Sequence, residues 1–316
     1  MFEPLFLDSV LQEKIWGGKK LETVFGYPLT SEKTGEYWAI SAHPHGVSTI
    51  NNGEFKGMKL DELWKNHKEL FGNAEGEVFP LLTKILDAND WLSVQVHPDD
   101  AYGKAHAGEL GKTECWYILD AEPGSEIIYG HHAKTREELR NMIEAGRWDD
   151  LLTRVKVKTG DFFYVPSGTM HAIGSGILIL ETQQSSDTTY RVYDFDRVDD
   201  AGQARELHIE ESIDVMKIPG TTEIVEEKVQ QLGRSNLTTF VETEFFNVYK
   251  WEIQAPTDIE TAADYSLVSI IEGRGTLEIE GQTWKIEKGN HFILPYQVNH
   301  VKVNGEFEAI VSTPGK

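Results

Sequence analysis

An internal repeat is the feature that most constrains the fold of this chain. Residues 160–171 read GDFFYVPSGTMH, and residues 289–300 read GNHFILPYQVNH. In each copy a Pro follows the Gly by six positions and a His follows it by eleven. Because Pro is tolerated at a corner but not inside a strand ladder, the pattern predicts a strand, a corner and a return strand that carries the His. Two copies of one β module predict two small barrels in tandem.

Short β-like stretches, punctuated by Gly, Pro and Asp, occupy much of the chain. They lie at 35–41, 91–97, 115–119, 125–129, 161–165, 177–182, 247–253, 265–271, 275–280, 291–294 and 307–311. Even spacing of many short strands favours a barrel or jelly roll over a parallel α/β fold. We therefore predict a mainly β protein made of two tandem β-barrels (jelly rolls).

Helical patterns are fewer and lie between groups of strands in the N-terminal half. Apolar residues recur with a helical period at about 59–71, and a weaker pattern covers 206–217. Thr135 and Glu138 have the spacing of a capping box, which predicts a helical insert at about 135–152. The stretch EIVEEKVQQ at 223–231 is polar and charged. We place a domain boundary there, between an N-terminal domain at 1–230 and a C-terminal domain at 231–316.

The charge balance and the cysteine count exclude several classes of protein. The 316 residues include 30 Lys and Arg against 52 Asp and Glu, a formal net charge of −22. Nucleic acids and anionic membranes favour positive surfaces, so we expect neither as a partner; protein partners are not predictable. Cys115 is the one cysteine, which rules out an intramolecular disulfide. The acidic N-terminus lacks the pattern of a secretory signal, so we expect a cytoplasmic protein.

Four residues of the first half have the types and positions of metal ligands. In the predicted strand at 91–97, alternation places Gln95 and His97 on the same face. Glu114 opens the next strand, and His171 lies on the return strand of the first repeat. This mixed nitrogen and oxygen set suits zinc or another borderline divalent ion, and it would also suit Fe(II). Since no thiolate is present, we expect an open catalytic site and not a closed structural one.

The second repeat keeps a His but lacks the other candidate ligands. His300 occupies the repeat position, yet no Gln-x-His strand and no matching Glu precede it. We therefore expect the C-terminal barrel to lack a metal, and we interpret His291 and His300 as structural or surface residues.

Five motifs together resemble the type I mannose-6-phosphate isomerases in their short bacterial form. They are GEYWAIS at 35–41, QVHP at 95–98, KTECWYIL at 112–119, PSGTMHA at 166–172 and ETQQSSDTTYRVYDFDR at 181–197. The motifs run in the family's order, and the likeness covers nearly the whole chain. It implies a cupin fold with a single zinc ion per chain. It also implies His97, Glu114 and His171 as ligands, with Gln95 binding the metal directly or through water.

The same resemblance implies the reaction and the residues that perform it. The expected reaction is interconversion of mannose 6-phosphate and fructose 6-phosphate through an enediol, which needs a base and stabilisation of oxygen charge. Arg191 matches the family's catalytic Arg, and Lys112 matches an active-site Lys. Glu181 is the first candidate for the base, and Lys112 with a depressed pKa is the second. For the phosphate group we name Lys112 and Ser48 as candidate contacts.

Two other functions fit a metal-binding cupin barrel. An Fe(II) oxygenase would consume oxygen, but it gives no reason for Lys112 and Arg191. A non-catalytic sugar-phosphate-binding cupin would be stabilised by its ligand without turning it over.

Overall fold

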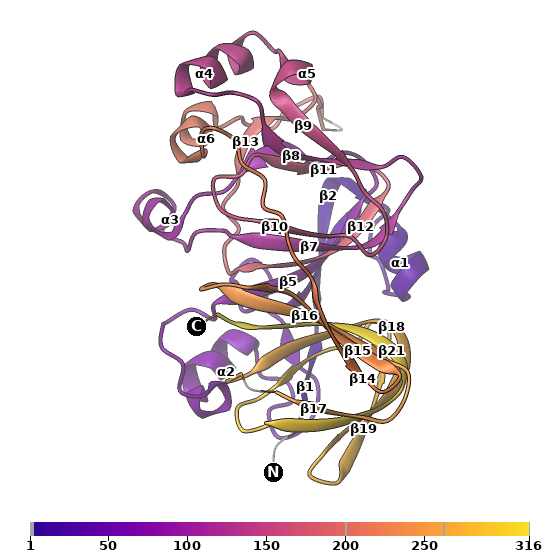
Figure 1. Cartoon of the computed structure of the whole chain (residues 1–316). Coiled ribbons are helices and arrows are strands. Elements are labelled where there is room, and N and C mark those ends of the chain that lie inside the picture. The colour runs from indigo at the N-terminus through magenta and orange to yellow at the C-terminus, as the bar shows by residue number, and fades with distance from the viewer. Residues whose placement is uncertain (1–2, 200, 262, 316) are drawn as a thin grey trace.

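Antiparallel strands dominate the fold, as the sequence predicts. The computed structural model describes residues 3–199, 201–261 and 263–315. Within these residues the strands form a six-stranded, a five-stranded and a ten-stranded sheet. Figure 1 shows the C-terminal strands, in orange and yellow, gathered at one end of the molecule and the first two sheets at the other.

The six-stranded and five-stranded sheets make the first barrel. The six-stranded sheet has the order β10 (Phe162–Val165), β7 (Glu114–Ala121), β12 (Ile177–Gln184), β5 (Leu81–Ala88), β3 (Thr34–Ile40), β2 (Val10–Gly18). The five-stranded sheet has the order β13 (Tyr190–Tyr193), β6 (Val94–Val96), β11 (His171–Ile173), β8 (Glu126–His131), β9 (Leu152–Lys156). Side chains from both sheets, such as Leu86 and Trp116 from one and Ile127 and Ile173 from the other, share one buried cluster. This cluster is the barrel core, in which each large apolar side chain contributes about 1.5–3 kcal/mol.

The second barrel is built on the ten-stranded sheet. Its main path runs β14 (Lys228–Leu232), β15 (Ser235–Glu242), β16 (Phe246–Ile253), β21 (His300–Pro314), β18 (Ser266–Ile279), β20 (His291–Leu294), β1 (Leu5–Asp8), β4 (Thr49–Ile50). Two further strands pair beside this path, β17 (Thr257–Glu260) with β21 and β19 (Gln282–Glu287) with β18. The N-terminal strands β1 and β4 thus complete a sheet of C-terminal strands. The domain division near residue 230 stays a prediction.

The helices cover the outside of the strand framework. On the first barrel, three helices pack on the five-stranded sheet: α4 (Arg136–Glu144), α5 (Trp148–Leu151) and α6 (Ile209–Val215) (Figure 1). The others are α1 (Lys20–Phe25), α2 (Leu60–Asn66), α3 (Asp100–His106) and the 3₁₀ helix η1 (Lys68–Phe71). Thr135 caps α4 by accepting from the Glu138 amide at 3.1 Å, as the sequence spacing predicts.

The two barrels pack through an apolar layer. β5 and β12 are buried at every position, because one face meets the core of the first barrel and the other faces the second. Leu180 of β12 shares a cluster with Leu267 and Ile310 of the second barrel, and Trp64 of α2 joins it. A sheet covered on both faces gives strands without polar alternation.

The repeat is confirmed as one β module used twice. In the first copy β10 leads through a corner to β11, which begins at His171. In the second copy β20 leads through a corner to β21, which begins at His300. Both corners carry the same backbone bond, Thr169 to Pro166 at 3.1 Å and Val298 to Pro295 at 3.2 Å.

Several strand predictions differ from the structure in extent, and the predicted strand at 307–311 is part of the longer strand β21. The predicted strand at 91–97 is shortened to β6, since the Leu92 amide bonds across to the Ile173 carbonyl before regular pairing begins. The predicted strands at 265–271 and 275–280 are one strand, β18. The pairing register of β18 with β21 shifts between Ile270 and Glu272, and β18 stays paired to β21 on both sides of this shift.

Candidate metal centre

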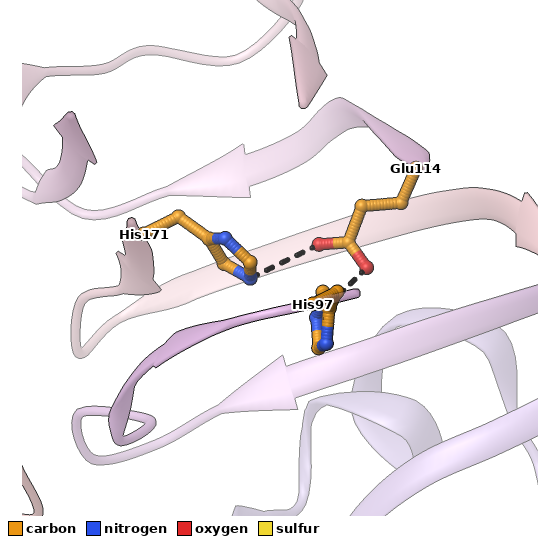
Figure 2. A group of neighbouring side chains, drawn as sticks. All are labelled: His97, Glu114 and His171. Carbon is orange, nitrogen blue, oxygen red and sulfur yellow. Dashed lines mark ion pairs between the residues drawn. The ribbon is translucent and has the colours of Figure 1, made fainter. Parts of the chain in front are cut away.

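Three of the predicted ligands meet between the two sheets of the first barrel. His97 follows β6, and His171 opens the neighbouring strand β11, both in the five-stranded sheet. Glu114 opens β7 in the facing six-stranded sheet. Figure 2 shows the carboxylate of Glu114 between the two imidazoles, with one oxygen toward each ring. The barrel therefore brings together residues that lie far apart in the sequence.

The distances among these three side chains suit a shared cation. Glu114 Oε2 lies 3.4 Å from His97 Nε2, and Glu114 Oε1 lies 3.3 Å from His171 Nε2. All three potential ligand atoms lie within 4.8 Å of one another, and every side chain is buried. Ligands at about 2.0–2.2 Å from a tetrahedral zinc are separated by about 3.3 Å. Among the residues that the structure describes, this is the one such group of three His, Cys or acidic side chains.

Hydrogen bonds at Nδ1 set each imidazole so that the lone pair of Nε2 faces the centre. His97 Nδ1 donates to the Thr188 carbonyl at 3.0 Å, and His171 Nδ1 donates to the Thr169 carbonyl at 2.8 Å. Such a bond sets the tautomer in which Nε2 carries the lone pair. Burial lowers the pKa of His97 to about 3 and also lowers that of His171, so both rings are neutral. His97 Nε2 and Glu114 Oε2 are buried without a hydrogen-bond partner, which is the deficit that a cation would fill.

A cavity of about 80 Å³ opens from this centre. Its wall holds Glu114 and Gln95 together with three predicted active-site residues, Lys112, Glu181 and Arg191. A polar cavity beside a partly unsatisfied ligand set is typical of a catalytic site that keeps an open position at the metal.

Known proteins resemble this chain over its whole length. The sequence family model of the phosphomannose isomerase type I catalytic domain matches residues 5–127. The family model of the mannose-6-phosphate isomerase cupin domain matches residues 236–314. A mannose-6-phosphate isomerase of Streptococcus mutans is 58% identical over 99% of this chain and 98% of its own. The chain belongs to the type I phosphomannose isomerase family. The crystal structure of the Bacillus subtilis mannose 6-phosphate isomerase, 50% identical, superposes with a TM-score of 0.95 over 98% of this chain and 99% of that one.

Membership of the type I phosphomannose isomerases confirms the predicted cupin fold. The family is metal-dependent, and the structure supplies the matching centre of His97, Glu114 and His171. In the described part of the chain no helix has the length and apolarity to cross a membrane.

Gln95 lies beside the centre of this phosphomannose isomerase fold, but its amide nitrogen faces the ligands. It is paired with His171 across β6 and β11, and its Nε2 lies 3.3 Å from His171 Nε2. Its Oε1 accepts from the Ser93 hydroxyl at 3.3 Å. A direct metal bond would need the opposite orientation of the amide, so the ligand role of Gln95 stays a prediction.

Lys112 and Glu181 lie buried beside each other and next to Glu114. Lys112 Nζ lies 3.3 Å from Glu114 Oε2 and 3.9 Å from Glu181 Oε1. Burial and the charge of Glu114 raise the pKa of Glu181 to about 8. Burial opposes the charge of Lys112, but Glu114 and Glu181 outweigh it and raise the pKa above its ordinary value. The depressed pKa that a base role for Lys112 requires is therefore not found.

Arg191 reaches the cavity from β13, where it pairs with Gln95. Its Nη1 donates to the Glu206 carbonyl at 2.7 Å, which fixes the guanidinium. Its Nε is buried and has no hydrogen-bond partner in the protein.

Ser48 is not brought to this cavity. Its hydroxyl accepts from the Ser41 amide at 3.0 Å and lies 3.4 Å from the Ala39 carbonyl, so it stabilises the chain around β3 and β4. It is not among the described residues that line the cavity. Its role as a phosphate contact stays a prediction without support from this geometry.

The cavity wall also holds charged residues that are not among the site residues predicted from the sequence. Glu36 lies 3.8 Å from Lys84 and 3.3 Å from Lys14, and all three line the cavity. Lys84 is the one charge within the apolar run LLTKIL of β5, and a lone Lys in a buried strand is a signal that points to a site. Asp187 also lines the cavity.

Proposed function

We propose that this chain interconverts mannose 6-phosphate and fructose 6-phosphate with one Zn²⁺ per chain. The observation that carries the proposal is the buried centre of two imidazoles and one carboxylate, opening on a cavity with Lys112, Glu181 and Arg191 in its wall. The high identity to proteins named for this reaction supports the same assignment. An oxygenase or a simple binding protein gives no reason for these three residues together.

The donor set supports zinc as the metal. Neutral imidazoles and a carboxylate are zinc ligands in catalytic sites, where a further position stays open. A bound Zn²⁺ supplies a Lewis acid that polarises sugar oxygens at C1 and C2. Cys115, the one cysteine of the chain, is a buried free thiol, which supports a reducing cytoplasmic location.

The residues of the chain then have distinct tasks. Glu181 moves the proton between C1 and C2, and burial, which raises the pKa of its carboxyl, suits a group that must both accept and return a proton. Arg191, as a permanent cation with a free donor, stabilises the negative charge of the enediolate. Lys112, held in its charged form between Glu114 and Glu181, binds a substrate oxygen.

Removal of the metal tests this function directly. Purified protein is assayed for conversion of mannose 6-phosphate to fructose 6-phosphate, after treatment with a chelator and after zinc is added back. We expect activity to fall to background with the chelator and to return with stoichiometric zinc. Activity that is indifferent to metal removal would reject the proposal.

A further inference from the structure

One carboxylate outside the cavity holds the loop that connects β12 to β13. Glu109 Oε2 accepts three hydrogen bonds, from the Ser186 hydroxyl, the Asp187 amide and the Thr188 hydroxyl, each at 2.9 Å. Its other oxygen lies 3.2 Å from His43 Nε2. Donors on three consecutive residues converge on a single oxygen, so the conformation of this loop depends on Glu109.

The same loop reaches the metal centre through its backbone. The Thr188 carbonyl accepts the Nδ1 hydrogen of His97 at 3.0 Å, which determines the tautomer and the tilt of that imidazole. Asp187 and Thr189 also line the cavity. A displacement of the loop would therefore misdirect His97 Nε2, the nitrogen that faces Glu114.

Glu109 itself has no direct contact with the proposed ligands. It lies in the connection between α3 and β7 and is not among the described residues that line the cavity. Burial opposes its ionisation, but the bonds from Asp187, Thr188, Ser186 and His43 outweigh burial and lower the pKa of its carboxyl. It is thus an ionised acceptor, and hydrogen bonds to an ionised group are about twice as strong as neutral ones.

We propose that Glu109 is a positioning residue for the metal centre. Its carboxylate fixes the β12–β13 loop, and the loop carbonyl of Thr188 in turn holds His97 with Nε2 toward the metal position. The inference rests on the metal-dependent function proposed above, and it assigns Glu109 no contact with metal or substrate. Groups that orient metal ligands typically change metal affinity 10–100-fold when removed. Because Glu109 acts through one further residue, we expect an effect of about tenfold.

The test compares zinc affinity in three variants by competition of the apo-proteins with a chromophoric chelator. Glu109→Ala should raise the zinc dissociation constant about tenfold, and Glu109→Gln roughly threefold, since a neutral acceptor keeps about half of the hydrogen-bond energy. Glu126→Ala is the matched control, because Glu126 pairs with Arg154 at 2.6 Å in the same barrel and its loss removes the same charge without touching the loop. Its affinity should stay within about twofold of the wild type, because exposed ion pairs contribute little.

The outcomes separate positioning from other roles. If the zinc dissociation constant of Glu109→Ala lies within twofold of the wild-type value, the inference is overturned. It is also overturned if Glu126→Ala raises the zinc dissociation constant as much as Glu109→Ala does, because that would indicate a general effect of charge. If circular dichroism shows that Glu109→Ala does not fold, the zinc affinity of Glu109→Gln is the test. An unchanged zinc affinity in Glu109→Gln then overturns the inference. Zinc at saturating concentration should restore part of the activity of Glu109→Ala, which a purely structural defect would not allow.

A double-mutant cycle tests the route through the loop. Thr188→Val removes one of the three donors to Glu109 and leaves the Thr188 carbonyl in place. If both residues act through one network, the double variant should bind zinc about as weakly as Glu109→Ala alone. Fully additive losses would contradict that route. Wild-type protein that binds no zinc would instead overturn the proposed function, so the two failures are distinguishable.

Discussion

The two barrels use the same module for different purposes. Gly160 and Gly289 both take the left-handed conformation, with φ of 92° and 89°, and both donate to a carbonyl of a neighbouring strand at 2.9 Å. At the repeat position of the return strand, however, His171 is 1% exposed and faces Glu114. His300 has a side chain that is 57% exposed and pairs with Asp258. The backbone geometry is shared, while the surroundings of the His are not.

A repeated sequence motif can therefore give the same backbone conformation twice without giving the same functional site twice. A metal centre needs partners on the facing strands, and in the first barrel these are His97 after β6 and Glu114 at the start of β7. In the second barrel the buried imidazole is His291, which lies between the hydroxyls of Tyr27 and Ser269 at 2.8 and 2.9 Å. A lone imidazole with hydroxyl neighbours stabilises packing and offers no cation a complete ligand set. That the second barrel binds no metal stays a prediction.

The largest expected contrast comes from the two repeat histidines. His171→Ala removes a proposed ligand, so zinc affinity should fall by more than about 100-fold, beyond the range for residues that only orient ligands. Turnover should fall with it. His300→Ala removes an exposed ion pair, which is worth about 0–1 kcal/mol, and should leave both unchanged. Zinc titration and the isomerase assay check both variants. If His300→Ala lost more zinc affinity and turnover than His171→Ala, the metal would have to be assigned to the second barrel.

A second contrast separates catalysis from metal binding. Arg191→Ala should lower kcat on the order of 10²–10³, the usual loss for a donor that stabilises developing charge. Its zinc content should equal that of the wild type, because Arg191 lies in the cavity wall and not in the proposed ligand set. Arg234→Ala, at an exposed turn of the second barrel, is the control. A wild-type kcat in Arg191→Ala would contradict the proposed role of Arg191 in stabilising the enediolate.

A third contrast concerns acid stability and the buried His291 of the second barrel. Burial lowers the pKa of His291 to about 3, below that of an ordinary His, so its contribution to stability is complete above the ordinary value and is lost as the pH falls toward 3. One such group changes the free energy of unfolding by up to about 1.4 kcal/mol per pH unit. His291→Gln should show a shallower loss of stability below about pH 6.5 in urea unfolding. Equal pH slopes in the two proteins would show that His291 does not titrate in this way.

Much of the fold follows from local patterns, which is why the sequence predicts it. The Thr135 capping box, the Pro corners and the strand that begins at His171 depend on residues close in the chain. The three proposed ligands are predictable from the sequence because His97 and Glu114 flank recognisable strands and the repeat gives His171.

Other features depend on long-range pairing that no local pattern encodes. The strand β1 completes the ten-stranded sheet by pairing Leu5 with Ile293, a contact between the two ends of the chain. The hydroxyl of Ser48 is used by the backbone around it, which only the tertiary structure shows. Glu109 lies in an ordinary polar loop of the sequence, yet folding places it against Ser186, Asp187 and Thr188. Such roles depend on which loops the barrel brings together.

The central claim is that one cation is held in the first barrel by His97, Glu114 and His171. Anomalous diffraction at the zinc absorption edge, from crystals of zinc-loaded protein, tests it most directly. We expect a single strong peak between Nε2 of His97, the carboxylate of Glu114 and Nε2 of His171, and no peak inside the second barrel. A peak beside His291, or none at the first centre in protein that is active and contains zinc, would contradict it.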